Sequence, residues 1–232
     1  SISKDFAPHA VKAGAVVIDN SSAFRMDPEV PLVVPEVNPQ AILKHKGIIA
    51  NPNCSTIIMV MALKPIYDLA KIKRVIVSTY QAVSGAGKEG IDELDAQVRE
   101  HSEGREMTAN ILPSASAEKH YPIAFNLIPQ IDVFCDNLYT KEEMKMVNET
   151  KKIMEDYEMR ITATTIRVPV YRSHSESVNI ELEKEVDLGV MREALAKFPG
   201  VTVQDDPSKQ EYPMPLYTSE KDDVYVGRLR RD

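Results

Sequence analysis

The sequence predicts a short α/β region followed by a longer α+β domain. Three apolar runs within residues 1–53 support the first prediction, because continuous apolar runs are typical of parallel strands covered on both faces. After residue 140, several strands with only two helices support the second. We therefore expect residues 1–53 to form the later part of an open, doubly wound sheet. Residues 54–232 are expected to form an α+β domain with a mostly antiparallel sheet.

Composition and charge exclude several classes of protein. The chain has 28 Lys+Arg and 35 Asp+Glu, a net charge of −7, and 43% hydrophobic residues, as in ordinary globular proteins. An acidic balance without a basic stripe argues against nucleic acid as the main partner. No apolar run of ~18 residues that would span a bilayer is found, and the first residues do not resemble a signal peptide. Two cysteines exclude a disulfide framework, so we expect a cytoplasmic protein without a metal site.

The first region has three expected strands. Residues 15–19 and 47–50 end at polar turns, and residues 32–34 lie between two prolines. Glycine is scarce, with 9 of 232 residues against an average of about 7%, and no Gly-rich phosphate loop occurs near the N-terminus. We therefore expect the opening strands of this sheet to lie outside this sequence.

The middle of the chain alternates helix and strand. Residues 55–70 are apolar nearly all round, which predicts a helix buried on every side. Residues 74–81 are expected to form a strand, and the turn at residues 84–87 precedes a charged helix over residues 88–102. Residues 105–136 are rich in loops and contain three prolines.

A capping box marks the start of the last region. Residues 140–143, Thr-Lys-Glu-Glu, predict the first turn of a helix whose inner face carries Met144, Val147 and Met154. Asp187 is expected to cap a second, shorter helix. Strands are expected at residues 161–168, 175–182, 201–203 and 224–229.

Cys54 is the first candidate for chemistry. It directly follows the Asn51-Pro52-Asn53 turn and directly precedes the expected buried helix. A thiol at a helix N-terminus faces unpaired N–H groups and the positive end of the helix dipole, which favours the thiolate that a nucleophile needs. The alternative is a buried structural cysteine, since Cys is among the most buried residue types. Cys135 has no histidine near it in the sequence and is interpreted as structural.

Arg167 and His174 are the second candidates. Arg167 ends one expected strand and His174 precedes the next, so a tight connection brings both to one edge of the sheet. Histidine exchanges protons near neutral pH, and arginine can hold a carboxylate through two parallel hydrogen bonds. A loop histidine considered alone is more often simply solvated.

Weaker signals mark further positions. Glu149 and Lys152 are three residues apart on the capped helix, a spacing that usually means a surface ion pair. Arg25 follows a strand end, where open α/β sheets bind ligands, although a plain surface arginine is the alternative. Gln81 ends a strand just before the turn at residues 84–87, whose backbone N–H groups can cradle a nucleotide. Short turns of this kind are common.

Four motifs, taken in order, resemble those of the aspartate-β-semialdehyde dehydrogenases. The resemblance extends over essentially the whole chain, and its cysteine and Arg/His motifs are specific. The motifs are Asn51-Pro52-Asn53-Cys54-Ser55-Thr56, Gln81-Ala82-Val83-Ser84-Gly85-Ala86-Gly87, Asn126-Leu127-Ile128-Pro129-Gln130-Ile131, and Arg167-Val168-Pro169-Val170 followed by His174-Ser175-Glu176.

The resemblance implies that residues 1–53 are the remainder of a Rossmann-type NADP-binding domain and that residues 54–232 form a catalytic and dimerisation domain. The implied reaction is the NADP-dependent reductive dephosphorylation of L-aspartyl-β-phosphate to L-aspartate β-semialdehyde through a cysteine thioacyl intermediate. This reaction lies on the branch to lysine, threonine and methionine. A homodimer or dimer of dimers is implied, with the strands of residues 161–182 as the expected interface.

The resemblance also implies roles for single residues. The nucleophile, the general acid/base and the group that orients the thioester would be Cys54, His174 and Gln81. Arg167 would hold the substrate α-carboxylate and Glu149 its amino group. The residues implied to receive the phosphate are Arg25, Asn53 and Lys152. The residues implied to line the cofactor are Ser84, Gly85 and Ala86.

The sequence departs from this family at its ends, which leaves two alternatives open. The opening strand, Gly-rich loop and helix of the family are not found, nor is its closing helix, and the spacing from Lys152 to Arg167 is short. One alternative is a reductase of N-acetylglutamyl phosphate, against which Asn53, Glu149 and Lys152 argue. The other is a non-catalytic module for dimerisation and substrate binding.

Overall fold

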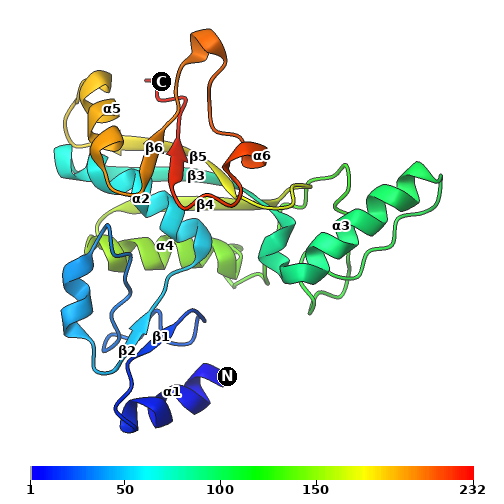
Figure 1. The fold of residues 1–232 in the computed structure, drawn as a ribbon, viewed down its shortest axis with the longest axis horizontal. Helices are drawn as coiled ribbons and strands as arrows, with labels where there is room; N and C mark the ends of the chain where they lie inside the picture. Colours follow the sequence, from blue (N-terminus) through cyan, green and yellow to red (C-terminus); the bar gives the residue numbers. More distant parts are fainter. Residues whose placement is uncertain (1) are drawn as a thin grey trace.

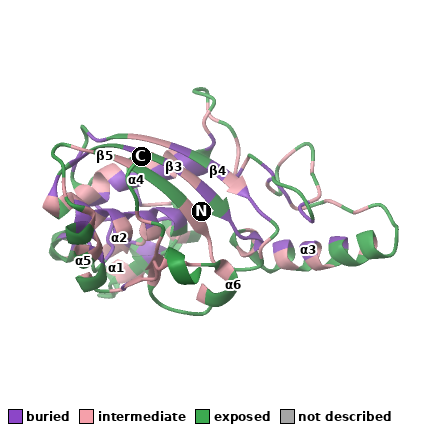
Figure 2. Ribbon diagram, turned by 90° about the horizontal axis from the view of Figure 1, so that it is seen from above, coloured by how far each residue is buried: buried purple, intermediate pink, exposed green. Residues whose placement is uncertain are grey.

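The computed structural model describes residues 2–232 and arranges them around one buried helix, α2 (Cys54–Leu69). The N-terminal unit lies on one side of this helix, and the largest sheet lies on another (Figure 1). The charged helix α3 (Gly87–Ser102) extends away from the rest of the molecule as an arm (Figures 1 and 2). The positions of the catalytic candidates therefore depend on how α2 packs against the sheet.

The remaining elements are α-helices, short 3₁₀ helices and strands. The other helices are α1 (Ile2–Lys12), α4 (Lys141–Met154), α5 (Leu188–Lys197) and α6 (Pro215–Thr218). Short 3₁₀ helices are η1 (Pro39–Lys44), η2 (Val83–Ala86) and η3 (Pro207–Lys209). The strands are β1 (Val17–Asp19), β2 (Ile48–Ala50), β3 (Ile72–Gln81), β4 (Arg160–Arg167), β5 (Ser175–Leu182), β6 (Val201–Val203) and β7 (Val224–Val226).

The N-terminal unit is parallel, as predicted, but one of its expected strands is wrong. β1 and β2 pair in parallel, whereas residues 32–34 make only one bridge, from Leu32 to Ala50. The N–H of Val34 instead donates to Asn38 Oδ1 at 2.9 Å, and the flanking prolines offer no N–H to a ladder. Helix α1, which contains Pro8, was not anticipated.

The central sheet has the strand order β4-β3-β5 and is mixed. β3 pairs in parallel with β4 and antiparallel with β5, and β6 pairs in parallel with β7. The α/β and α+β classes are confirmed, but the prediction of a mostly antiparallel sheet is wrong. The reason is topological: the chain passes from β4 to the far side of β3 before it forms β5, so two consecutive strands are not neighbours.

Helix α2 is buried on several sides, as its sequence predicts. Met59 and Leu63 pack with Val75 and Val77 of the sheet, together with residues of α4 and β4. A second cluster joins Val60, Met61 and Ile66 of α2 to α5 and to the N-terminal unit. The outer face of β3 has no such cover, since Ile76 and Tyr80 are each 40% exposed.

The buried face of α4 differs from the predicted one. The prediction placed Met144, Val147 and Met154 inward, whereas these three residues are only half-buried. The buried positions are three glutamates, two apolar residues and one threonine: Glu142, Glu143, Glu149, Met146, Ile153 and Thr150. The prediction failed because it used the apolar residues alone, and an apolar pattern does not indicate that glutamates are buried.

The predicted capping box is confirmed. Thr140 Oγ1 accepts from the Glu143 N–H at 3.2 Å, and Glu143 Oε2 accepts from the Thr140 N–H at 2.7 Å. Glu143 Oε1 also accepts from the Thr165 N–H of β4 at 3.0 Å. One carboxylate therefore caps the helix and attaches it to the sheet.

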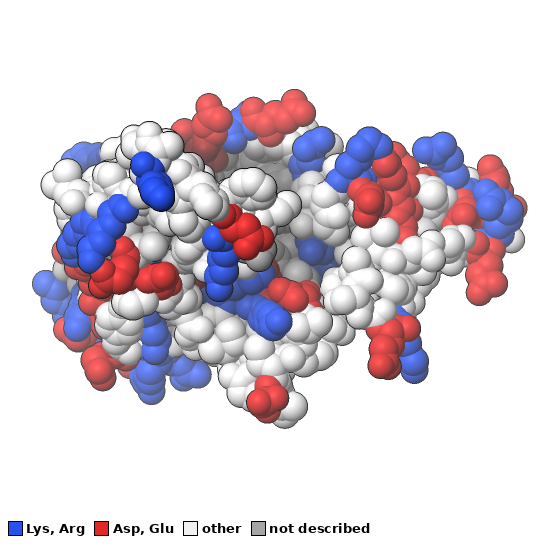
Figure 3. All heavy atoms as spheres, turned by 90° about the horizontal axis from the view of Figure 1, so that it is seen from below, with Lys and Arg blue, Asp and Glu red and all other residues white. Residues whose placement is uncertain are grey.

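The surface carries charges of both signs. On the face drawn in Figure 3, acidic and basic side chains are interspersed over the body and the arm. Residues 2–232 contain no helix with the length and apolar content that a bilayer crossing requires.

Replacing Glu143 by Ala should lower the free energy of unfolding by about 2–4 kcal/mol, because two buried N–H groups lose their acceptor. Urea denaturation measures this loss. Lys141→Ala, at an exposed position of the same turn, is the control and should change stability far less. Equal losses in the two variants would contradict the dual role of Glu143.

Candidate active site

The carboxyl ends of two strands and the N-terminus of α2 meet at one place. Gln81, at the end of β3, pairs in register with Arg167, at the end of β4. β5 runs the other way, so its first residue, Ser175, lies opposite Tyr80 and places His174 at the same edge. The prediction that a tight connection brings Arg167 and His174 together at one sheet edge is confirmed.

Cys54 begins α2, and the preceding residue caps the helix. Asn53 Oδ1 accepts from the N–H groups of Ser55 and Thr56 at 3.0 and 3.3 Å. The cysteine keeps surface open to solvent. Desolvation of the sulfur nevertheless raises the pKa of Cys54, and the charge of Glu142 adds to this effect. Hydrogen bonds from Ser55 and the charge of Arg167 lower the pKa but do not prevail, so the resting residue is a thiol, not the expected thiolate.

His174 is held by the peptide that follows β3. Its Nδ1 accepts from the Ala82 N–H at 3.0 Å, so the neutral ring carries its proton on Nε2. Burial and, secondly, the Arg167 charge lower the pKa of His174 to about 4, while Glu142 opposes the shift. The imidazole is therefore neutral near pH 7.

Arg167 is a buried cation with spare hydrogen-bonding capacity. The side chain is 4% exposed, and one terminal nitrogen donates to the Ala82 carbonyl at 2.7 Å. Its Nε has no partner among residues 2–232. Burial lowers the pKa of Arg167, opposed by Glu142 and Cys54. An unsatisfied buried guanidinium N–H is costly, so the site favours an incoming anion.

A second cluster contains Arg25 and Glu149, which form a buried ion pair at 3.2 Å. Glu149 Oε2 also accepts from the Asn53 N–H at 2.7 Å. Burial raises the pKa of Glu149, although Asn53 and Arg25 act against it. Lys152 Nζ donates to three carbonyls, those of Arg25, Asp27 and Val30, at 2.7–2.8 Å. Burial lowers the pKa of Lys152.

The turn that precedes α3 packs on the Arg167–His174 pair. A Cβ on Gly85 would lie 2.7 Å from an Arg167 nitrogen and 3.3 Å from a His174 carbon, so this position needs glycine. The N–H groups of Val83, Ser84 and Gly85 are all used by carbonyls of the chain itself. The expected cradle of free N–H groups is therefore not formed by these three residues.

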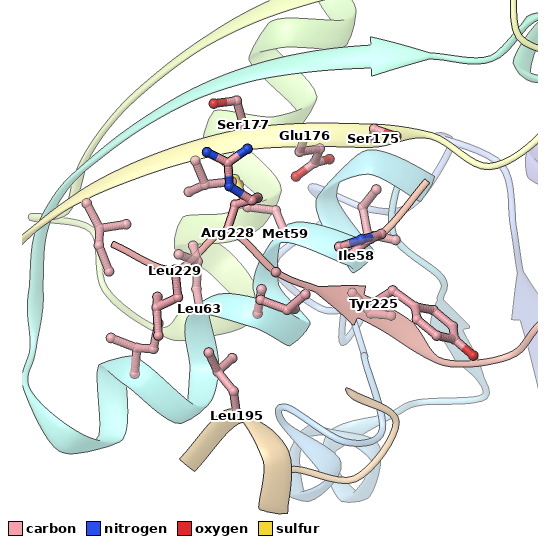
Figure 4. A pocket seen from close by; sticks show the side chains of 18 of the residues that line it. Ile58, Met59, Leu63, Ser175, Glu176, Ser177, Leu195, Tyr225, Arg228 and Leu229 are labelled. Atoms are coloured by element: carbon pink, nitrogen blue, oxygen red, sulfur yellow. The ribbon is translucent and has the colours of Figure 1, made fainter. Parts of the chain in front are cut away.

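Cys54, Ser84 and His174 lie along one cavity of about 1200 Å³. α2 contributes Ile58, Met59 and Leu63 to its wall, and β5 contributes residues 175–177 (Figure 4). Glu176 also lines it; burial raises the pKa of this carboxyl well above its usual range, and Oε1 has no partner within the described residues.

Sequence reasoning missed one residue that joins the two clusters. Glu142 Oε1 accepts from Asn53 Nδ2 at 2.9 Å and from Gln81 Nε2 at 3.1 Å. The sequence signal at this position, the capping box, predicts only a helix start. Nothing local in the sequence indicates that residues 53, 81 and 142 meet.

Comparison with known proteins gave two family models that match the chain. The model described as "Semialdehyde dehydrogenase, NAD binding domain" matches residues 1–45. The model described as "Semialdehyde dehydrogenase, dimerisation domain" matches residues 63–232.

Similar proteins cover the whole chain. Aspartate-semialdehyde dehydrogenases of Aquifex aeolicus and Bacillus subtilis are 57% and 55% identical to it over 100% of this chain and 67% of their own length. A crystal structure of aspartate semialdehyde dehydrogenase II from Vibrio cholerae, complexed with ASA, has a TM-score of 0.93 and 47% identity over the same shares. A Candida albicans structure with NADP has a TM-score of 0.72 and 25% identity over 100% of this chain and 66% of that one. The chain thus spans about two thirds of the length of these relatives.

His174 should titrate near pH 4, because burial and the Arg167 charge disfavour the imidazolium. Histidine ring resonances followed by NMR against pH measure this. Since the folded-state pKa lies below the unfolded value of 6.5, folding becomes less favourable as the pH falls from about 6.5 to about 4. Arg167→Met removes the neighbouring cation and should raise the pH midpoint of the His174 titration. A midpoint near 6.5 in the parent chain would contradict the arrangement.

Proposed function

Because the chain belongs to the aspartate-semialdehyde dehydrogenase family, we propose that it reduces L-aspartyl-β-phosphate to L-aspartate β-semialdehyde with NADPH, through a thioacyl intermediate on Cys54. The family members named above, from Aquifex aeolicus and Bacillus subtilis, are oxidoreductases of the aspartate pathway. One observation supports the assignment most directly. A cysteine at a helix N-terminus, a neutral histidine and a buried arginine with an unpartnered N–H are gathered at one sheet edge.

In the first step the sulfur of Cys54 attacks the acyl carbon. The S–C bond forms, the C–O bond to phosphate breaks, and the phosphate leaves with the electron pair and the thiol proton. Covalent capture divides one difficult reduction into two easier steps. Because the pKa of Cys54 is raised, the resting sulfur carries a proton, which must be removed for the attack.

The neutral His174 is suited to donate a hydrogen bond to the oxygen on the reacting carbon. With Nδ1 engaged by Ala82, Nε2–H is the group it offers, and donation to a developing oxyanion lowers the barrier. This donation is electrostatic stabilisation; we propose the general acid/base role of His174 in addition, and it requires an unprotonated Nε2 to take up a proton. Gln81, whose amide is fixed by Ser55 and Glu142, is proposed to orient the thioester.

Each charged group of the substrate has a proposed partner in the chain, and the geometry supports these partners to different degrees. Arg167 is the proposed partner of the α-carboxylate, since its Nε is free. Glu149 is proposed for the ammonium group, and Arg25, Asn53 and Lys152 for the phosphate. The three donors of Lys152 are occupied by carbonyls, so phosphate must displace at least one of them. The geometry thus supports Arg167 more strongly than Lys152.

NADP is the proposed cofactor, and its reduced form, NADPH, would supply the hydride when bound. The NAD-binding domain match at residues 1–45 and the Candida albicans relative with NADP support this proposal. Ser84 fits contact with the reactive end of the cofactor, because it lines the cavity that also contains Cys54 and His174. Gly85 packs on Arg167 and His174, so its proposed cofactor contact is limited to its exposed side, and Ala86 is proposed beside it.

We further propose a cytoplasmic homodimer, or a dimer of dimers, and a domain boundary near residue 53. The dimerisation-domain match at residues 63–232 supports the dimer. The outer face of the central sheet is the proposed interface, because it exposes Ile76 and Tyr80 without a covering helix.

Cys54→Ala should lower the rate by about 10³-fold or more, since the nucleophile is lost. The assay follows NADPH formation from aspartate semialdehyde, NADP and phosphate with the complete protein. Cys135→Ser is the matched control and should keep the parent rate. An unchanged rate in Cys54→Ala would exclude the thioacyl route. Supplying N-acetylglutamate semialdehyde in competition tests the related reductase, and saturable NADP binding would exclude a non-catalytic module.

Arg167→Lys should lower kcat/KM for aspartate semialdehyde about 10- to 100-fold, mainly through KM, because a charge-assisted hydrogen bond is worth about 1.5–3 kcal/mol. Arg172→Lys, an exposed arginine five residues further along, is the control. An aldehyde without the α-carboxylate should show no difference between the parent and Arg167→Lys. A loss of equal size with both aldehydes would contradict carboxylate binding by Arg167.

A further inference from the structure

Glu142 is a buried carboxylate to which the proposed reaction assigns no role. It is 5% exposed and lies in the first turn of α4. Its Oε1 accepts from Asn53 Nδ2 and Gln81 Nε2, at 2.9 and 3.1 Å, and its Oε2 pairs with Lys145 Nζ at 3.1 Å. Every partner is a donor, which requires the anionic form. Burial alone would raise the pKa of Glu142, but Lys145 and the two amides lower it overall.

The Asn53 amide can point only one way. Its Oδ1 accepts two backbone N–H groups of α2, which can only donate. Its Nδ2 must therefore find an acceptor inside the protein, and Glu142 is the acceptor there. Without it, an amide donor next to Cys54 would be buried and unpaired, at a cost that falls on the helix cap.

The Gln81 amide is fixed by the same carboxylate. An anionic Glu142 cannot donate, so Gln81 must present its NH₂ group toward it. The same NH₂ group reaches Ser55 Oγ at 2.7 Å, beside the nucleophile. Glu142 thus decides which end of the Gln81 amide faces α2.

Glu142 is also the common counter-charge of the site. It faces Lys145 on its own helix, Cys54 on α2, Arg167 on β4 and His174 before β5, with Glu149 two turns away on α4. Lys145 in turn pairs with Asp132 at 3.1 Å. Glu142 stabilises the cationic form of Arg167 and the protonated form of Cys54.

From these contacts we propose that Glu142 is a positioning residue, which orients the amides of Asn53 and Gln81 beside Cys54. The effect of its negative charge on Cys54 can be measured without substrate and does not require the proposed reaction. The kinetic part rests on the proposed function, because it assumes that Cys54 and Gln81 act in catalysis.

The first test measures the thiol directly. In a Cys135→Ser background of the complete protein, the alkylation rate of Cys54 by iodoacetamide is followed against pH by mass spectrometry. Glu142→Gln keeps the shape of the side chain and removes its charge. The pH at which the alkylation rate of Cys54 is half-maximal, the alkylation midpoint, should therefore fall. Glu143→Gln removes the adjacent buried carboxylate, which is not among the groups that shift Cys54, and should leave the midpoint in place. Coincident profiles for Glu142→Gln and the background protein would overturn the proposal.

The second test separates orientation from charge. Glu142→Ala removes the acceptor and should lower kcat about 100-fold, the loss associated with a displacement of about 1 Å at a reacting group. Glu142→Gln retains an acceptor oxygen and should recover much of kcat, with little change in KM for phosphate. A kcat in Glu142→Ala equal to that of the parent would overturn the positioning role. Failure of the proposed function appears separately, as an active Cys54→Ala protein, and leaves the alkylation result standing.

Discussion

The hydrogen bonds of Asn53 join helix α2 to helix α4 at the candidate site. Its side-chain oxygen caps α2, its side-chain nitrogen reaches Glu142, and its backbone N–H reaches Glu149. The residue thereby fixes the start of the buried helix against two turns of α4. Cys54 follows directly, so the position of its sulfur depends on these bonds. The two carboxylates of α4 also reach different parts of the molecule, since Glu142 accepts from Gln81 of the sheet and Glu149 from Arg25 of the N-terminal unit.

The buried charges form two linked groups with different balance. Arg25 and Glu149 neutralise each other, and Lys152 supports the backbone next to Arg25. On the other side, Glu142 is shared between Lys145 and two amides, so it compensates Arg167 only through space. Arg167 remains buried with a free Nε. In the first group Arg25 and Glu149 form an ion pair with each other. In the second group Arg167 has no hydrogen-bonded anion within the described residues, which favours the binding of a carboxylate.

The elements that the sequence predicts well are those whose signals are local. The caps at Thr140 and Asp187 and the apolar surroundings of α2 need only neighbouring residues, and the structure has them as expected. The mixed sheet depends on how the chain crosses β3 between β4 and β5, which no local pattern encodes. The inner face of α4 was misplaced for a related reason. Its buried glutamates find their donors on residues 53, 81 and 165, far away in the sequence.

The same distinction applies to the site. Cys54, Arg167 and His174 were identifiable because each lies at the junction of two elements, and Gln81 because it ends a strand. The protonation state of Cys54 was not predictable, because the helix N-terminus is only one of several competing effects. A helix terminus contributes about 0.3–1 kcal/mol, whereas a full charge at about 5 Å contributes up to about 3 kcal/mol at an effective dielectric of about 20. Desolvation and the Glu142 charge therefore outweigh the dipole. The resting Cys54 is therefore a thiol, which the helix N-terminus alone does not predict.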